Sequence, residues 1–423
     1  QVNTEIFRGE IVSYQPANGP DSPFSLYYPK DSCENYPLLV ILDPHAAGKQ
    51  VVEKYQQLAD KYDVILAASD KVQNGMIPNQ FLPLINSIIN EVSSVLPVDT
   101  TKIYLLGFSG GARMAAVTAM SQDNIQGIIT CGAGTPEIAR ITRNDFLYIG
   151  MAGYRDFNFS ELFHSEKAIN EQHKQAHFLY FDGAHEWPSD STMEFAFALI
   201  SSQKADKESL SDLVMSSFKK NYKPHDEWRK YLDYRAVQTL TQNVQGMKNE
   251  KEAMVQYLKG SKSQMALREI EKNFESEYAS MQELQQSLTS KDSVWWRKKI
   301  SKLWLAKDKV QKTSADYVDI RLLGYISISC YMYVTAALKE GDLNNAARFL
   351  DVYLLADPTN SEVSYYYGVY FARTGQYQAA IDSLSNALDR GFSDYARWNS
   401  EEAFIPLKDS LRYIDLESRM NAL

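Results

Sequence analysis

The chain has 423 residues, of which 44% are hydrophobic and 23% charged, so it can bury the cores of roughly two or three domains. Its net charge of −9 argues against a nucleic-acid-binding protein, because binding to a phosphate backbone needs clustered positive charge. The cysteines Cys33, Cys131 and Cys330 lie far apart with no C-x-x-C pair, which argues against a zinc or redox framework. No apolar run approaches the roughly 18 residues needed to cross a bilayer, so we expect no membrane span.

Residues 1–204 alternate between strand-like and helix-like segments. Two amphipathic stretches predict helices over 51–61 and 79–96, the second with Asn79 as a candidate N-cap. Several of the other runs are apolar throughout, as in strands that are covered on both faces. The alternation predicts a doubly wound, mostly parallel sheet wrapped by helices. The expected strands are 10–15, 23–28, 36–43, 63–69, 102–108, 125–132, 145–152 and 177–183.

The strand pattern disappears after residue 204. Residues 205–310 carry apolar side chains at helical intervals among Lys, Glu, Gln, Ser and Met, and we expect an all-helical linker or hairpin. Within this segment, WWRKKISKLWLAK (295–307) combines tryptophans with basic residues. One interpretation is a helix on a membrane surface. The favoured interpretation is a helix that packs Trp296, Ile300 and Trp304 inward.

Residues 311–423 contain an internal repeat. Gly341 recurs as Gly375 and Ala346 as Ala380, an offset of 34 residues in each pair. In this period and in its small and aromatic positions, the segment resembles the tetratricopeptide repeat, which implies an α-solenoid. Two roles stay open for it. It could form a groove for a protein partner, or it could be a helical appendage that packs on the first half or mediates self-association.

The segment GFSGGAR (107–113) fits G-x-S-x-G, the turn that presents a nucleophilic serine. The strand-like IYLL precedes it and the helix-like GARMAAVTAM follows it, which is the context that the motif requires. Gly107, Gly110 and Gly111 suit a sharp turn in which a helix packs close to a strand. We therefore expect Ser109 to be a nucleophile; the alternative is a small-residue turn with an incidental serine.

A serine nucleophile needs a base and an acid that orients the base. In this architecture the acid and then the histidine follow the serine along the chain. Asp156 and His185 each come just after a predicted strand, at the sheet edge where doubly wound folds place their sites. Asp156 could instead cap the next helix, and Asp182 is a weaker candidate for the acid. His173 and His177 have the spacing of metal ligands without an H-E-x-x-H glutamate, so we expect a solvated helix face and no metal site.

Two backbone N–H groups should stabilise the oxyanion that such a reaction forms. One belongs to the residue after the nucleophile, here Gly110, and the other to the loop after the third strand, here LDPHAAGK (42–49). Small residues in that loop allow a close approach to a substrate. We expect the second donor to be His45 or Ala46, although His45 could also contact the substrate or pack within the loop.

The stretches LLVILDPHAAG, LLGFSGGARMA, GYRDFN and GAHEWP make residues 1–204 resemble the α/β-hydrolase fold. Within it they look most like the small serine esterases related to polyhydroxybutyrate depolymerases, feruloyl and acetylxylan esterases and dienelactone hydrolases. The resemblance implies that Ser109 is the nucleophile, Asp156 the acid and His185 the base, with no metal or organic cofactor. GAHEW is similar to the G-H-x-W ending of that group, and we expect Trp187 to contact the substrate. DPHAAG departs from the usual His-Gly pair, and no long insertion that could form a lid precedes the acid.

The function that these features predict is hydrolysis of a carboxylic ester through an acyl-enzyme, on a small-molecule or polysaccharide-linked substrate. One alternative is a peptidase or amidase with the same triad. Another is a non-catalytic interaction protein in which the repeat half binds a partner and the hydrolase fold is a scaffold. Because the chain begins at Gln1 without a methionine, we expect export to the periplasm or the medium, with the cytoplasm as the alternative.

Overall fold

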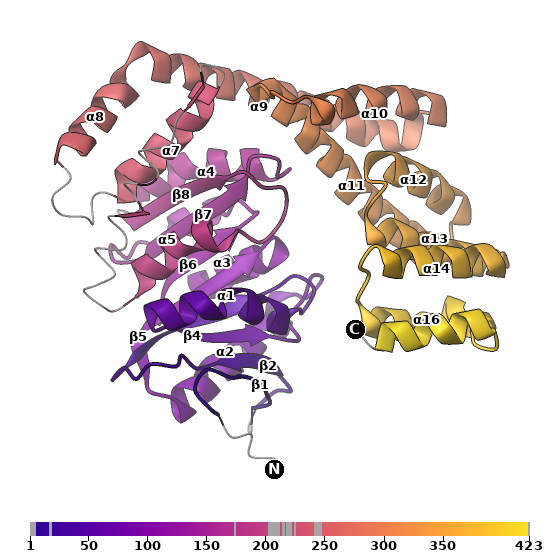
Figure 1. Cartoon of the computed structure of the whole chain (residues 1–423), viewed down its shortest axis with the longest axis horizontal. Helices are drawn as coiled ribbons and strands as arrows, with labels where there is room; N and C mark the ends of the chain where they lie inside the picture. The colour runs from indigo at the N-terminus through magenta and orange to yellow at the C-terminus, as the bar shows by residue number, and fades with distance from the viewer. Residues whose placement is uncertain are drawn as a thin grey trace. The chain divides into compact units, whose positions relative to one another are not determined.

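A computed structural model of the chain contains two compact units, residues 1–270 and 271–423 (Figure 1). The structure describes residues 6–16, 19–172, 175–201, 212–213, 216, 222–223, 226–240 and 248–421. The division between the units falls inside 205–310, the segment that the sequence predicts to be a linker or hairpin.

The first unit is built on one eight-stranded sheet with the order β1-β2-β4-β3-β5-β6-β7-β8. β2 is antiparallel to both of its neighbours, and the other neighbouring pairs are parallel. Each predicted strand is present, and the expected doubly wound, mostly parallel sheet of the α/β-hydrolase type is confirmed. The strands are β1 Ile11–Tyr14, β2 Phe24–Tyr27, β3 Tyr36–Leu42, β4 Ile65–Ser69, β5 Val98–Phe108, β6 Ile125–Cys131, β7 Leu147–Gly153 and β8 Gln175–Phe181.

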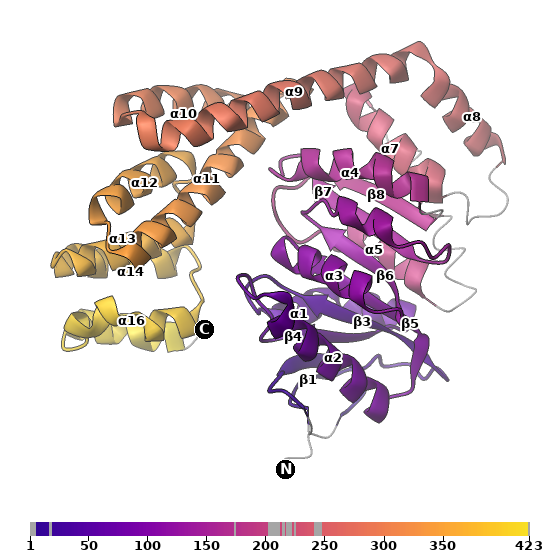
Figure 2. The same cartoon turned by 180° about the vertical axis from the view of Figure 1, so that it is seen from behind.

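Helices cover both faces of this sheet, as Figures 1 and 2 show. Tyr55 of α1, Phe197 of α5 and Val237 of α7 share one core with alternate residues of the strands, such as Leu39 and Ile41 of β3. α2, α3 and α4 pack on the sheet outside that core. The helices are α1 Gly48–Tyr62, α2 Pro78–Val95, α3 Gly110–Ser121, α4 Phe159–Gln172, α5 Asp190–Ile200, α7 Glu227–Leu240 and α8 Lys248–Lys259.

The start of α2 differs from the sequence prediction. The helix begins at Pro78 with Ile77 as its N-cap residue, so the predicted cap at Asn79 is wrong. Proline is favoured at the first helical position because the N–H that it lacks would have no partner within the helix. Gln80 completes the start of the helix, since its Oε1 accepts a hydrogen bond of 3.0 Å from Ile77 N.

Part of the predicted linker belongs to the first unit, because α7 packs along β8. His177 Nδ1 of β8 lies 3.0 Å from Thr239 Oγ1 of α7, and Arg235 of α7 forms an ion pair with Glu166 of α4. Burial raises the pKa of the Glu166 carboxyl. Residues beyond 204 therefore complete the covering of the β8 edge.

The second unit is helical in its described residues. In α10, Trp296 and Ile300 are buried, and Trp304 Nε1 donates to Leu355 O at 3.0 Å, which confirms the inward packing that the sequence favours. The helices are α9 Ser261–Ser290, which begins before the division, α10 Ser293–Asp308, α11 Ser314–Glu340, α12 Leu343–Ala356, α13 Ser361–Arg373, α14 Tyr377–Asp389, α15 Tyr395–Ser400, the 3-10 helix η4 Glu402–Leu407 and α16 Leu411–Asn421.

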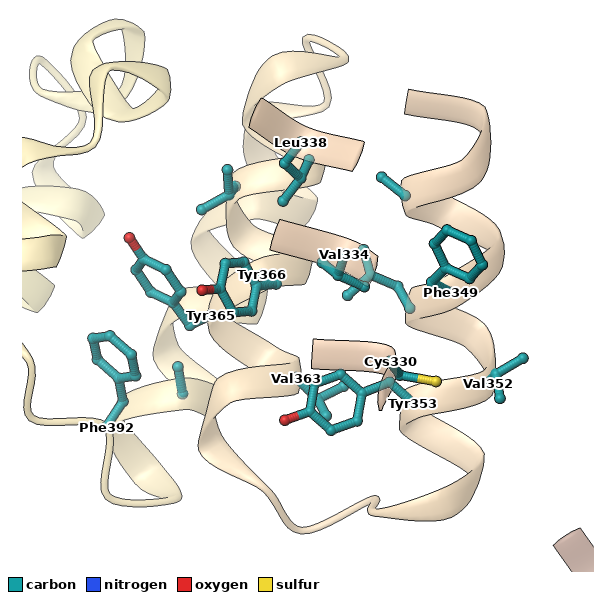
Figure 3. Close-up of a cluster of buried hydrophobic side chains, with 14 of the residues drawn as sticks. Cys330, Val334, Leu338, Phe349, Val352, Tyr353, Val363, Tyr365, Tyr366 and Phe392 are labelled. Carbon is teal, nitrogen blue, oxygen red and sulfur yellow. The ribbon is translucent and has the colours of Figure 1, made fainter. Parts of the chain in front are cut away.

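The internal repeat corresponds to two equivalent helix–turn–helix units. Gly341 and Gly375 adopt left-handed φ angles of 76° and 74°, each in the turn between two helices. Ala346 and Ala380, the other repeated pair, are completely buried at the start of the helices that follow. Figure 3 shows the apolar side chains gathered between these helices, among them Val334. The all-helical, solenoid-like architecture expected of residues 311–423 is therefore present.

Among the described residues, α11 is long and apolar enough to cross a membrane by length and composition. Half of its most apolar window is buried within the unit. Its buried side chains, such as Cys330 and Val334, belong to the core shared with α12 and α13. The core helix of a folded unit passes the same length test, so this finding assigns no span.

Candidate active site

The turn that carries Ser109 has an unusual backbone conformation. β5 ends at Phe108, α3 begins at Gly110, and Ser109 between them has φ 51° and ψ −116°. A residue other than glycine rarely adopts a positive φ, and such strain is concentrated at functional sites. Ser109 N donates to Cys131 O at 2.8 Å, which ties the turn to the end of β6. The serine is thus presented on a strand-to-helix turn at the carboxyl edge of the sheet.

Two glycines of the motif are required by close packing. A β-carbon on Gly111 would lie 2.0 Å from Leu42 O, and one on Gly107 would lie 2.4 Å from the Gly111 carbonyl carbon. Both obstacles are backbone atoms, which cannot move aside as the end of a side chain can. The glycines therefore allow α3 to start directly against β3 and β5.

The structure brings Ser109, Asp156 and His185 together. His185 Nε2 lies 3.0 Å from Ser109 Oγ, and His185 Nδ1 lies 2.9 Å from Asp156 Oδ1. Asp156 is 1% exposed, and its Oδ1 also accepts a hydrogen bond of 2.8 Å from Asn158 N. The weaker acid candidate, Asp182, is exposed and lies 3.6 Å from Arg155 instead. The two distances from His185, to Ser109 and to Asp156, are those of a base to its nucleophile and to the group that orients the base.

Aromatic rings enclose the imidazole of His185. Its centroid lies 4.7 Å from the ring of Phe108 and 4.2 Å from that of Phe157. Gly132, with φ 63°, lies close to the same imidazole, because a β-carbon there would lie 3.1 Å from His185 Cε1. Phe157 and Gly132 are not among the site residues predicted from the sequence. Adjacency to Asp156 is the only sequence signal for Phe157.

Asp43 organises the loop in which the sequence analysis places the second oxyanion donor. Its Oδ1 accepts hydrogen bonds from His45 N at 2.8 Å and from Ala47 N at 3.3 Å. Ala46 N donates to Asp43 O at 3.2 Å, and Ala46 has a left-handed φ of 57°. The N–H groups of His45 and Ala46 therefore already have acceptors inside the loop. The His45 side chain is mostly exposed.

Trp187 connects this loop with the segment that carries His185. Its Nε1 donates to Asp43 Oδ2 at 2.9 Å, and its ring lies 5.3 Å from that of Phe108 and 6.2 Å from that of Tyr55. Asp43 is buried, and hydrogen-bond donors reach both of its carboxylate oxygens. It is not among the site residues predicted from the sequence. Trp187 also lines a cavity of about 810 Å³. The residue predicted to contact the substrate thus lies beside both the loop and the triad.

Of the two histidines with the spacing of metal ligands, His177 lies within the described residues. Among the residues that the structure describes, no group of three or more His, Cys, Asp or Glu side chains could hold a metal ion. His177 lies in β8 with 1% of its surface exposed, so the expected solvated helix face is wrong for this residue. The strand that begins at Gln175 alternates faces, and His177 points inward, toward Thr239. His173 lies outside the described residues.

His177 is expected to make the first unit less stable in mild acid. Thr239 Oγ1 donates to Ala236 O and so accepts from His177 Nδ1, while His177 Nε2 has no partner within the described part of the chain. Burial lowers the pKa of His177 to about 4, whereas an unfolded histidine titrates near 6.5. Its contribution is therefore complete above about pH 6.5 and is lost as the pH falls toward 4. The loss is about 1.4 kcal/mol per pH unit within that window.

Urea denaturation at pH 7.5, 6 and 5 measures this effect. We expect the free energy of unfolding of the wild-type protein to fall by about 2 kcal/mol more than that of His177→Gln between pH 7.5 and 5. The carboxylates contribute equally to the pH dependence of both proteins, so their contribution cancels in the difference. Equal pH slopes for the two proteins would contradict the prediction.

No family model matches the chain, and no curated protein matches it. Solved structures similar to its first part include FphF, a fluorophosphonate-binding serine hydrolase of Staphylococcus aureus, at 13% identity, 46% of this chain, 99% of that chain and a TM-score of 0.38. Est1E from Butyrivibrio proteoclasticus is 17% identical over 48% of this chain and 99% of that one, with a TM-score of 0.35. A ferulic acid esterase is 14% identical over 46% of this chain and 98% of that one, with a TM-score of 0.38. Likeness at these values shows neither an activity nor a substrate for this chain.

Proposed function

We propose that the protein is a serine hydrolase that cleaves carboxylic esters through a Ser109–His185–Asp156 triad. The observation that carries the proposal is the pair of contacts that His185 makes, 3.0 Å to Ser109 Oγ and 2.9 Å to Asp156 Oδ1. A hydroxyl is a poor nucleophile until a base removes its proton, and the base needs an acid to hold it in the right tautomer. The strained backbone of Ser109 supports the same role.

The reaction proceeds in two steps. His185 Nε2 takes the proton of Ser109 Oγ as the oxygen attacks the ester carbonyl, and the imidazolium then passes this proton to the departing alkoxide. The acyl group remains on Ser109. His185 next deprotonates a water that attacks the acyl-enzyme, and the proton returns to Ser109 Oγ as the acid product leaves. Asp156 keeps the Nδ1 proton of His185 in place throughout, and the N–H of Gly110 stabilises the oxyanion.

Several parts of the function stay predictions. The substrate is expected to be a small ester or one linked to a polysaccharide, with Trp187 in contact with it and no cofactor. The solenoid-like half is expected to bind a protein partner or to mediate self-association. Export to the periplasm or the medium also stays a prediction.

A serine-directed fluorophosphonate probe tests the proposal on the full chain. We expect the wild-type protein to be labelled and Ser109→Ala to remain unlabelled, because the probe forms its bond with an activated serine oxygen. The wild-type protein should also hydrolyse p-nitrophenyl acetate. An unlabelled wild-type protein, or equal labelling of Ser109→Ala, would overturn the proposal. Hydrolysis of peptide anilides without hydrolysis of the ester would show that the activity is that of a peptidase and not of an esterase.

A further inference from the structure

The proposed reaction needs a second oxyanion donor, and the backbone of the Asp43–Ala47 loop does not offer one. Pro44 has no N–H, and the N–H groups of His45, Ala46 and Ala47 all donate to oxygens of Asp43. Asp43 is itself buried and held by Trp187 Nε1, so this arrangement is anchored from outside the loop. Of the backbone donors that the sequence predicts, Gly110 is left.

A second loop lies along the first and places a side chain beside Gly110. It follows β4, and Asn74 N donates to Pro44 O at 2.9 Å, while Gln73 and His45 form an isolated antiparallel bridge. A β-carbon on Gly110 would lie 1.8 Å from Asn74 Oδ1 and 2.9 Å from Asn74 Cγ. The Asn74 carboxamide thus occupies the space beside the Gly110 α-carbon. By covalent geometry its oxygen lies within roughly 4.5 Å of the Gly110 amide nitrogen, while its nitrogen Nδ2 would lie 3.5 Å from the same β-carbon.

The Asn74 carboxamide is also available for a ligand. The residue is exposed, and its side chain makes no hydrogen bond with the part of the chain that the structure describes. Rotation about the last side-chain bond exchanges the oxygen with the NH2 group, which carries two donors. A neutral amide donor beside a backbone N–H is the combination that stabilises a tetrahedral oxyanion in acyl transfer.

We propose that Asn74 is a catalytic residue that donates its side-chain N–H to the oxyanion, as the partner of the Gly110 N–H. This assignment rests on the proposed function and replaces the backbone donors expected at His45 or Ala46. It also explains why residue 110 is glycine. Any side chain there would displace the carboxamide.

The test measures kcat and KM of the full chain on p-nitrophenyl acetate. Asn74→Ala is expected to lower kcat about 10²–10³-fold with little change in KM, because an oxyanion donor acts in the transition state. Asn74→Asp keeps the shape but places a carboxylate near the oxyanion, so its loss should be at least as large. Gln73→Ala, in the same exposed loop, is the matched control and should stay within about threefold of wild type.

Gly110→Ala provides an independent variant, because its new methyl group takes the place of the carboxamide. Its kcat should fall comparably, and the double variant Gly110→Ala/Asn74→Ala should lose little more than either single variant. Single losses that multiply in the double variant would overturn the assignment, and so would an Asn74→Ala protein within about threefold of an active wild type. A wild-type protein that neither labels with fluorophosphonate nor hydrolyses the ester would overturn the proposed function together with this assignment.

Discussion

Asp156→Asn is expected to lower kcat on p-nitrophenyl acetate about 10⁴-fold. Asp156 Oδ1 serves His185 Nδ1 and Asn158 N at the same time, and Oδ2 has no hydrogen-bond partner among the described residues. An asparagine that keeps its oxygen at the Oδ1 position would bury an NH2 group without an acceptor and would lack the charge that stabilises the imidazolium. One that turns its NH2 toward His185 would favour the wrong tautomer. Either orientation removes much of the base's function.

Asp182→Asn is the matched control for that experiment. Asp182 is the other acid that the sequence offers near His185, but it is exposed and lies beside Arg155. Its substitution should leave kcat within about threefold of wild type, because an exposed ion pair contributes little. The two variants are measured with the same ester under the same conditions. A large loss in Asp182→Asn together with a small one in Asp156→Asn would assign the acid to Asp182 instead.

Glu277→Gln is expected to lower the free energy of unfolding of the second unit by about 3–5 kcal/mol. Arg321 of α11 forms a bidentate pair with Glu277 of α9, with Nε at 2.8 Å from Oε1 and one terminal nitrogen at 2.6 Å from Oε2. Both side chains are at least 97% buried. Removal of the carboxylate takes the Glu277 negative charge away from a guanidinium that is 3% exposed. Urea denaturation followed by tryptophan fluorescence measures the loss, because four of the six tryptophans lie in residues 271–423.

Two further variants separate the buried charge from the packing around it. Asp382→Asn breaks the pair with Arg412, in which both side chains are more than half exposed, and should change the free energy of unfolding by less than about 1 kcal/mol. Glu277→Leu combined with Arg321→Met removes both charges and should recover much of the stability lost in Glu277→Gln. A Glu277→Gln protein as stable as Asp382→Asn would contradict the prediction.

Local pattern was sufficient for most of the first unit. A strand between two helices has to bury both faces, so runs such as YPLLVIL are recognisable wherever they occur, and β3 agrees with its prediction to within one residue. The boundaries that differ have specific causes. α2 starts one residue before Asn79 because Pro78 is suited to the first position of a helix. The prediction for His177 differs in its environment, since this polar residue lies on the inward face of β8.

Asp156 and His185 could be placed from the sequence because of how parallel strands are arranged. Each follows a strand, and the ends of parallel strands meet at one edge of the sheet, so residues far apart in the chain come together there. The residues that surround them have no comparable signal. Phe157 and Gly132 lie beside His185 only through the folded arrangement of three different loops.

Local periodicity and chain order are enough to predict the alternating sheet, the glycine-lined turn at Ser109 and the order of serine, acid and histidine. The contacts of the two loops beside that turn follow from the tertiary structure alone. Asp43 engages the N–H groups of its own loop, and Asn74 lies beside Gly110 although 36 residues separate them in the chain. Such a contact depends on how the loops after β3 and β4 pair with one another. No periodicity within either loop encodes that pairing.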